Sequence, residues 1–348
     1  VVLEAYRAWG PACVERFNGM FAFALWDTRR QRLFLARDRY GIKPLYYARC
    51  GETFLFGSEV KALREHPSFE TALSKPHLLE YLTFQNLLTD GTLFGGVKLL
   101  PAGCTLEVDP GGGMRQARYW DFDFHEPDQP LRAEEYEEEL DFLFRQAVQR
   151  QLVSDATVGA YLSGGLDSGG ITAVASKSLR NLTTFTCGFD MTSASGLELS
   201  FDERAKAEAL SYQFQTEHYV VVLKAGDMQR CLPQLVWHLE DLRVGQSYPN
   251  YYVARLASKF AKSVLGGTGG DELFAGYPWR YYRAVVNDDF DHYVSKYYDF
   301  WSRLLPNEVF PDLFRPEVWD DVRDVDTRQI FRGLLERGSS EAPRTPIE

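Results

Sequence analysis

Six consecutive residues, Ser163-Gly164-Gly165-Leu166-Asp167-Ser168, place small residues, two hydroxyls and a carboxylate directly after an apolar run at 158–162. The two glycines let the backbone turn sharply, so that amide groups can face an anion at close range. A helix predicted over 170–179 would add unpaired N–H groups and the positive end of its dipole. Both serines can donate to phosphate oxygens, and an acid beside phosphates is favourable when it holds Mg²⁺. The alternative is a glycine-rich turn in which Asp167 only caps the helix.

A second glycine-rich segment, GGTGGDELFAGY (266–277), follows another short apolar run at 263–265. So many glycines indicate a backbone that runs close to a ligand. The paired acids Asp271 and Glu272 can share a second metal contact or orient a nucleophile. The alternative here is a loop whose Asp271 caps a helix. A third cluster, Gly111-Gly112-Gly113, lies between two predicted strands and opens no helix, so it predicts a hairpin turn.

Strand-like and helical patterns alternate around the first two motifs. This alternation is typical of a parallel sheet covered on both faces. Ligands of such sheets bind outside the carboxyl ends of the strands, where both motifs lie. The predicted strands are 158–162, 183–187, 218–222 and 263–265, and the predicted helices are 170–179, 203–212, 228–240 and 250–260.

The first 122 residues have a different pattern, with short apolar runs separated by turn residues. They predict an antiparallel sheet with a few helices. A polar stretch at 122–132 marks a domain boundary, and an acidic amphipathic helix follows over 134–152, with Tyr136, Leu140, Phe144 and Val148 on its apolar face. The expected strands are 21–26, 32–36, 45–48, 53–56 and 105–108, and the expected helices are 1–9, 59–64 and 76–83.

Composition restricts the classes of function. The chain has 348 residues, 25% of them charged, and a formal net charge of −11, which disfavours nucleic acid as a partner. No apolar run approaches the ~20 residues that span a bilayer. No signal peptide is visible, so a cytoplasmic location without membrane association is expected. Five scattered cysteines indicate reduced thiols, not a disulfide framework or a zinc site: Cys13, Cys50, Cys104, Cys187 and Cys231.

Together the two motifs resemble the asparagine synthetase family of ATP-pyrophosphatases. The pyrophosphate loop of that family reads Ser-Gly-Gly-Leu-Asp-Ser, and its second loop reads Gly-acid-Gly-small-Asp-Glu-Leu-Phe-Gly-Gly-Tyr. Upstream, FNGMFAFALWD (17–27), ARDRYGIKPLYY (36–47) and SEVKAL (58–63) look like the later part of the family's glutaminase domain. Between the loops, FTCGF (185–189), SFDE (200–203) and His218 also follow the family pattern.

The resemblance implies two domains, in a fold that is α/β and α+β. Residues 1–122 would be part of an Ntn-type glutaminase αββα sandwich, and 133–348 a parallel-sheet adenine-nucleotide (ATP-pyrophosphatase) domain. The implied enzyme adenylylates aspartate with ATP and Mg²⁺, after which ammonia displaces AMP and gives asparagine. In the full-length protein the ammonia comes from glutamine. The expected partners are these small molecules and a second copy in a homodimer.

The resemblance also implies roles for individual residues. Leu162, Cys187, Gly266 and Gly267 would touch the adenosine part of ATP. The pyrophosphate would be held by Ser163, Gly164, Gly165, Asp167 and Ser168. Mg²⁺ would be held by Asp167 and Asp271.

Three departures from the family pattern affect these expectations. The chain starts inside the glutaminase domain, so the N-terminal catalytic Cys is expected to be absent, and Cys13 cannot replace a nucleophile that uses its own α-amino group as base. The chain has Gly169 where the family usually has a second Ser. The family also continues beyond the end of this chain into a segment with a catalytic Lys, and the helical, aromatic residues 285–348 are interpreted as structural.

Thr268 belongs to the same departure as Gly169, because it replaces the family's acid in the second loop. A threonine hydroxyl cannot take a proton near neutral pH, so it cannot be a general base. Either Asp271 or Glu272 does that task, or base catalysis is weak, or the acceptor is not aspartate. The alternatives for the whole protein are a carboxylate-adenylating cyclase or amidase of the β-lactam synthetase or lasso-peptide cyclase type, and a non-catalytic ATP-binding paralogue.

Overall fold

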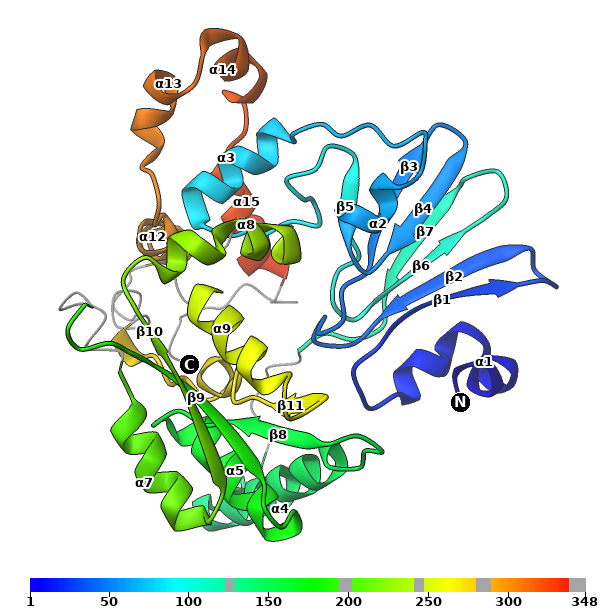
Figure 1. Cartoon of the computed structure of the whole chain (residues 1–348). Helices are drawn as coiled ribbons and strands as arrows, with labels where there is room; N and C mark the ends of the chain where they lie inside the picture. Colours follow the sequence, from blue (N-terminus) through cyan, green and yellow to red (C-terminus); the bar gives the residue numbers. More distant parts are fainter. Residues whose placement is uncertain (123–126, 128, 194–201, 241–246, 280–288, 338–348) are drawn as a thin grey trace. The chain divides into compact units, whose positions relative to one another are not determined.

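The computed structural model describes residues 1–122, 127, 129–193, 202–240, 247–279 and 289–337. It divides into two compact units (Figure 1). The first contains Val1–His125, Glu240–Leu242 and Tyr282–Glu348, and the second contains Glu126–Leu239 and Arg243–Tyr281. The described residues 289–337 therefore cluster with the first unit, whereas the domain bounds 1–122 and 133–348 remain a prediction. In the described part of the chain, no helix is both long and apolar enough to cross a membrane.

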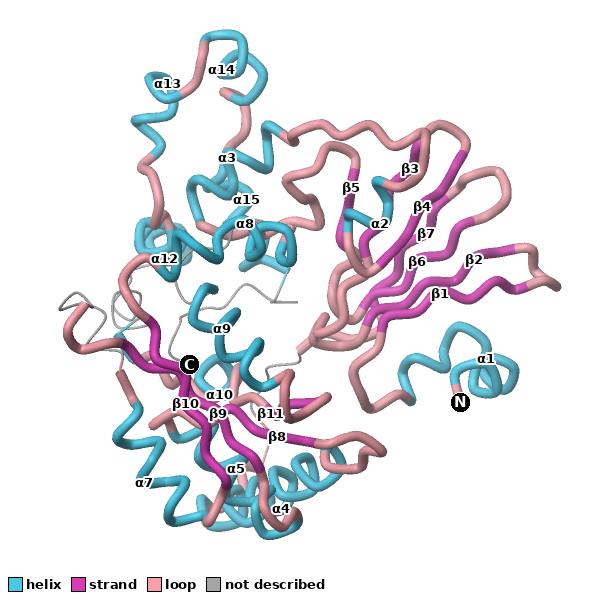
Figure 2. Tube along the Cα trace, viewed as in Figure 1, coloured by secondary structure: helices cyan, strands magenta, loops and turns pink. Residues whose placement is uncertain are grey.

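Two antiparallel sheets form the centre of the first unit (Figure 2). One has the order β1-β2-β6-β7 and the other the order β4-β3-β5. Helix α1, the 3₁₀ helix η1 and α2 pack on these sheets, and α3 packs with the C-terminal helices of the unit. The bounds are α1 Val2–Trp9, η1 Gly10–Arg16, β1 Ala22–Asp27, β2 Arg32–Arg37, β3 Tyr46–Cys50, β4 Thr53–Gly57, α2 Val60–Arg64, α3 Lys75–Phe84, β5 Val97–Leu99, β6 Cys104–Val108 and β7 Met114–Arg118.

Alternation along the strands produces four layers in this unit. On β2, Phe34 and Ala36 pack with residues of α1 and η1, whereas Leu35 points to the opposite face and packs with Tyr47 of β3. The next residue of β3, Ala48, packs with Val60 of α2. Because neighbouring residues of a strand face opposite sides, the order is helix, sheet, sheet, helix. The αββα arrangement expected from the resemblance is confirmed.

A buried carboxylate organises the loop between β2 and β3. Asp38 is only 1% exposed and accepts hydrogen bonds from the backbone N–H groups of Phe21, Tyr40, Ile42 and Lys43 at 3.0–3.2 Å. Buried backbone donors are costly when unpaired, so one side chain satisfies four of them. Asp38 of the segment 36–47 thus has a structural task in this protein.

The C-terminal helices of the first unit pack against α3. Phe84 forms a cluster with Val294, Tyr298 and Phe331, and Leu79 forms another with Phe310 and Val322. The described part of 285–348 is helical, as predicted. The bounds are α12 Phe290–Trp301, η2 Asn307–Val309, α13 Phe310–Leu313, α14 Pro316–Val322 and α15 Thr327–Arg337.

The second unit contains a parallel four-stranded sheet in the order β10-β9-β8-β11. Helices α5 and α7 pack on one face, with α4 against α5, and α9 covers the other face with α8 against it (Figure 1). The bounds are α4 Ala133–Gln151, β8 Val158–Tyr161, α5 Leu166–Ser178, β9 Thr183–Phe189, α7 Arg204–Phe214, β10 Glu217–Leu223, α8 Asp227–Leu239, α9 Ser247–Ala257, β11 Ser263–Leu265 and α10 Gly270–Leu273.

The strand order places a topological switch point beside β8. The chain runs from β8 to β9 and on to β10, and then returns to the other side of β8 as β11. Loops that leave β8 and β11 therefore diverge in direction at the same carboxyl edge, which is where open α/β sheets bind ligands. These two loops are the two glycine-rich motifs of the sequence.

Three features differ from the sequence predictions. The strand pattern alone predicted one antiparallel sheet, whereas the first unit has two, as the αββα resemblance implies. It also includes two strands that were not predicted, the three-residue β5 and the polar β7, which has no apolar alternation. Helix α5 begins at Leu166, four residues earlier than predicted, because packing overrides the low helix propensity of Gly169 and Gly170. On α4, Tyr136 and Leu140 are 44% and 47% exposed, and Val148 is its buried residue.

Candidate functional site

The first loop is held in shape by its two serines. The backbone N–H of Ser163 donates to Ser168 Oγ at 3.1 Å, and the two hydroxyls are 2.8 Å apart. Ser163 Oγ also accepts from the N–H of Gly165, the N-cap of α5, at 3.2 Å. Because α5 starts at Leu166, Asp167 and Ser168 stand in its first turn, where backbone N–H groups have no partner within the helix. This is a local geometry suited to an anion.

Strand β9 fixes the start of this loop. Leu162 is 1% exposed, its N–H donates to the carbonyl of Phe185 at 2.9 Å, and its carbonyl accepts from the hydroxyl of Thr186. Cys187, the next residue of β9, therefore lies near the beginning of the loop. Burial raises the pKa of its thiol, so Cys187 is a neutral side chain in this wall at neutral pH.

The second loop packs directly on the first one. A Cβ built on Gly267 would lie 2.8 Å from the backbone N of Ser168 and 3.0 Å from Cβ of Asp167. A Cβ on Gly270 would lie 2.6 Å from Oδ1 of Asp167. Only residues without a side chain permit these approaches, so the glycines of the second loop let Asp167 lie against it.

The two acids of the second loop, Asp271 and Glu272, are arranged differently from Asp167. Gly269, with φ of 108°, turns the chain into the single-turn helix α10, which contains Asp271 and Glu272. The carboxylate of Asp271 lies against Gly276, where an added Cβ would be 2.7 Å from Asp271 Cγ. Thr268 and Glu272 are exposed. The structure thus unites Asp167 with the glycines of the second loop, and the predicted roles of Thr268, Asp271 and Glu272 stay predictions.

The donor set fits Mg²⁺ bound together with phosphates. Asp167 and Asp271 are half-buried, and within the described ranges neither carboxylate has a hydrogen bond or an ion pair. Among these same residues, no group of three or more His, Cys, Asp or Glu side chains is placed to hold a metal ion. Mg²⁺ is usually bound by one or two carboxylates, waters and the phosphates of a substrate. A nucleotide on the first loop would supply those phosphates.

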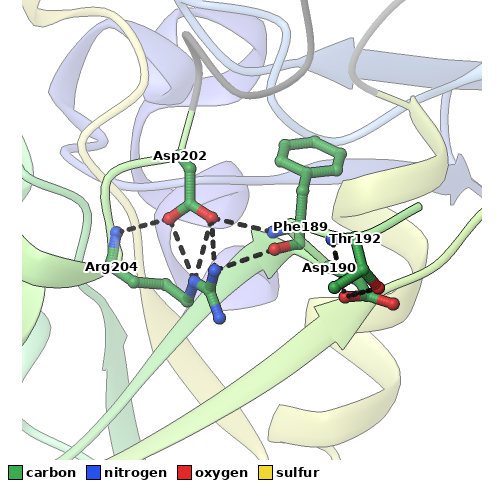
Figure 3. A network of polar contacts seen from close by, with 5 residues as sticks. All are labelled: Phe189, Asp190, Thr192, Asp202 and Arg204. Carbon is green, nitrogen blue, oxygen red and sulfur yellow. Dashed lines mark hydrogen bonds and ion pairs between the residues drawn. The ribbon is translucent and has the colours of Figure 1, made fainter. Parts of the chain in front are cut away.

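A polar network not foreseen from the sequence supports the end of β9 (Figure 3). Asp202 accepts from the backbone N–H of Phe189 at 3.0 Å and from the backbone N–H of Arg204 at 3.1 Å. Arg204 forms an ion pair with Asp202 at 2.7 Å and donates to the carbonyl of Phe189 at 2.8 Å. Burial raises the pKa of Asp202, but the hydrogen bonds from Arg204 and Phe189 outweigh it and leave the pKa lowered.

This network gives part of the SFDE segment a structural task. Asp202 and Arg204 fasten the start of α7 to Gly188 and Phe189 at the end of β9, and the aliphatic part of Arg204 lies against Gly188. The sequence did hold one sign of this network: Asp202 stands directly before the predicted helix 203–212, and an acid at that place is typical of an N-cap. Ser200 and Phe201 of the same segment lie outside the described residues.

Comparison with known proteins agrees with the two loops. A family model described as "Asparagine synthase" matches residues 139–342, and one described as "Glutamine amidotransferase domain" matches residues 1–120. Asparagine synthetase [glutamine-hydrolyzing] 3 of Bacillus subtilis is 33% identical over 336 residues, which are 88% of this chain and 52% of that protein. A putative asparagine synthetase [glutamine-hydrolyzing] of Mycobacterium bovis is 35% identical over 284 residues, 79% of this chain and 42% of its own.

A relative with a different name is almost as similar. The amidase chyE of Penicillium rubens is 30% identical over 321 residues, covering 84% of this chain and 44% of that protein. In each case the chain spans about half the length of the curated relatives it matches. Similarity of sequence therefore extends to proteins that are named for more than one reaction.

Proposed function

The chain belongs to the asparagine synthetase family, and from that premise we propose that its second unit activates a carboxylate with ATP for amide formation. The observation that carries the proposal is the contact of Asp167 with the glycines of the second loop at the switch point of a parallel sheet. An anion-binding loop and a free carboxylate meet there. That combination suits a metal-bound triphosphate better than a phosphate alone.

Each part of the first loop has a task in this proposal. The amides at the start of α5 and the hydroxyls of Ser163 and Ser168 bind phosphate oxygens. Leu162, Cys187, Gly266 and Gly267 border the adenosine. Mg²⁺ held by Asp167 and Asp271 would neutralise charge on the departing pyrophosphate. Catalysis then rests on in-line positioning of the acceptor carboxylate and on preorganised donors around the phosphates.

Aspartate is the proposed acceptor, and ammonia the proposed nucleophile that displaces AMP to form asparagine. In the whole protein the ammonia would come from glutamine, because residues 1–120 match a glutamine amidotransferase domain. A second candidate is amide formation on another carboxylate. It is favoured by Thr268 in place of the family's acid and by the similarity to an amidase.

Product analysis tests the proposal. The full-length protein should convert ATP to AMP and pyrophosphate in the presence of Mg²⁺ and an acceptor carboxylate, and Asp167→Asn should lower that rate on the order of 10³-fold. Release of ADP and phosphate would contradict adenylylation. Exchange of pyrophosphate into ATP separates an enzyme from a non-catalytic ATP-binding protein. Dependence on aspartate, compared with other carboxylic acids, decides between the two acceptors.

A further inference from the structure

A lysine lies across the first loop. The Cβ and Cδ atoms of Lys206 are each 2.6 Å from the position that a Cβ on Gly164 would occupy. The aliphatic part of Lys206 therefore runs over the Cα atom of Gly164. Its ammonium group, two bonds beyond Cδ, can reach the oxygens of an anion held on the loop. The residue is exposed, so the ammonium group remains hydrated and able to move.

The topology explains why a residue of α7 reaches this loop. Helix α7 precedes β10 in a parallel sheet, so its first turn lies at the carboxyl edge, beside the ends of β8 and β9. Two cations stand in that first turn. Arg204 is paired with Asp202, whereas Lys206 has no carboxylate within ion-pair distance among the residues that the structure describes.

The N-terminal end of α7 is not the proposed anion site. Asp202 already accepts the N–H of Arg204 and places a negative charge at the start of α7. A phosphate there would meet that carboxylate. The ammonium group of Lys206 is the group that favours an anion, and it adjoins a loop whose neighbouring acids, Asp167 and Asp271, make the site negative before any nucleotide arrives.

We propose that Lys206 binds the phosphate oxygens of the nucleotide's leaving pyrophosphate. The inference rests on the proposed function, since it takes the first loop as the phosphate site. Lysine acts on phosphate as a mobile point charge, so it can follow the oxygens as negative charge moves onto the leaving group. AMP lacks those phosphates and would not engage Lys206.

Equilibrium binding of ATP and AMP to the 348-residue chain tests this role, with Lys206→Met as the variant. Lys177→Met is the matched control, because Lys177 is also exposed but lies in the last turn of α5, at the opposite edge of the sheet. Lys206→Met should weaken ATP binding about tenfold, leave AMP binding unchanged and reduce the salt dependence of ATP binding. Lys206→Arg should keep most of the affinity, and Lys177→Met all of it.

The outcomes separate this inference from the function on which it rests. If the unaltered chain does not bind ATP, the proposed function fails and the role of Lys206 fails with it. If the chain binds ATP and Lys206→Met binds it equally well, only the inference is wrong. Equal weakening of ATP and AMP would also overturn it, because Lys206 would then shape the unit and not contact the pyrophosphate.

Discussion

Oδ1 of Asp167 lies 2.6 Å from the position that a side chain on Gly270 would need. Asp167 is in the first turn of α5, and Gly270 begins α10, more than a hundred residues later in the chain. The two loops therefore lie in direct contact, and the location of the carboxylate that we propose binds Mg²⁺ depends on a residue without a side chain. This contact explains why residue 270 is Gly, whereas the sequence indicated only that the backbone of the second loop runs close to a ligand.

Gly270→Ala should displace the Asp167 carboxylate. The new methyl group and the carboxylate cannot both keep their places, and misplacement by about 1 Å costs on the order of 10²-fold in rate. The measurement is ATP affinity of the 348-residue chain with and without Mg²⁺. In the unaltered chain Mg²⁺ should strengthen binding, and in Gly270→Ala most of that gain should be lost.

Gly170→Ala is the control for the added methyl group. Gly170 lies inside α5, where the nearest atom to an added Cβ is Cζ of Phe144 at 3.5 Å, an ordinary contact. It should keep the effect of Mg²⁺, and it should raise helix stability slightly. A Gly270→Ala chain with an unchanged Mg²⁺ effect would show that Asp167 does not hold the metal ion.

Ala275 has a left-handed backbone, with φ of 54°. The family pattern has Gly at this place, and a Cβ in the left-handed region costs about 1–2 kcal/mol. The greater freedom of Gly in the unfolded chain offsets roughly 0.4–1 kcal/mol. Ala275→Gly should therefore raise the free energy of unfolding of the second unit by about 0.5–1 kcal/mol, measured by urea denaturation.

Ala205→Gly is the opposite substitution in the same unit. Ala205 is exposed within the first turn of α7, where the backbone is helical and Gly is less favourable by about 1 kcal/mol. The two variants should thus shift the urea midpoint in opposite directions. A decrease in stability for both would mean that Ala275 is not strained in the folded protein.

The strands and helices of the second unit could be predicted from the sequence, but the contacts between its loops could not. Strand β11 was predicted with its observed bounds, 263–265, because an apolar run stood between turn residues. The contact between Asp167 and Gly270 could not be predicted, because it depends on which strands are neighbours in the sheet and not on the local pattern of apolar residues. The same holds for Lys206, whose exposed position and lack of a motif gave no signal in the sequence.

In the first unit, apolar periodicity failed to predict two features, a buried carboxylate and a polar strand. In the sequence Asp38 is one residue of a segment that resembles the family, yet in the structure it satisfies four backbone donors. Strand β7 is exposed along its whole length, and its pairing with β6 makes it a strand. Neither the hydrogen bonds of a buried carboxylate nor the pairing of a polar strand follows from apolar periodicity.

His218 should make the second unit less stable at mildly acidic pH. Its Nδ1 lies 2.9 Å from the hydroxyl of Thr184, and its buried Nε2 has no partner among the described residues. Burial lowers the pKa of His218 below 6.5, and Glu208 opposes this only in part. The unfolded chain then takes up a proton first as the pH falls, so stability is lost from about pH 6.5 down to the folded-state pKa.

Urea denaturation at about pH 7.5 and 5.5 measures this effect, since each unit by which the folded pKa is lowered is worth about 1.4 kcal/mol. His218→Asn removes the titrating group and keeps a polar side chain near Thr184, so its stability should depend less on pH than that of the unaltered chain. His238→Asn, on the exposed surface of α8, should not change the dependence. Equal pH dependence in all three proteins would contradict the argument.

Because Thr268 replaces the family's acid, another residue must act as general base in the acceptor step if one is used. The family resemblance implies that an acid at this position would steer acyl-adenylate formation and move a proton when ammonia attacks. A threonine hydroxyl cannot accept that proton near neutral pH. Thr268 is exposed at the turn before α10, and Glu272, four residues later, is exposed within it. Of the nearby acids, Glu272 is the stronger candidate, because the carboxylate of Asp271 lies against Gly276.

Two variants of the full-length protein decide whether the acid has moved along the loop. If Glu272 is the base, Glu272→Gln should lower aspartate-dependent asparagine formation by 10²–10⁴-fold, the usual contribution of general base catalysis, while Thr268→Glu changes it little. AMP release and asparagine are measured separately, because loss of the base should affect the second more than the first. An active Glu272→Gln together with a strongly activated Thr268→Glu would show a weakened loop without a relocated acid. AMP release with another carboxylate, and no asparagine from any of these proteins, would mean that the adenylylation chemistry is right and the acceptor is not aspartate.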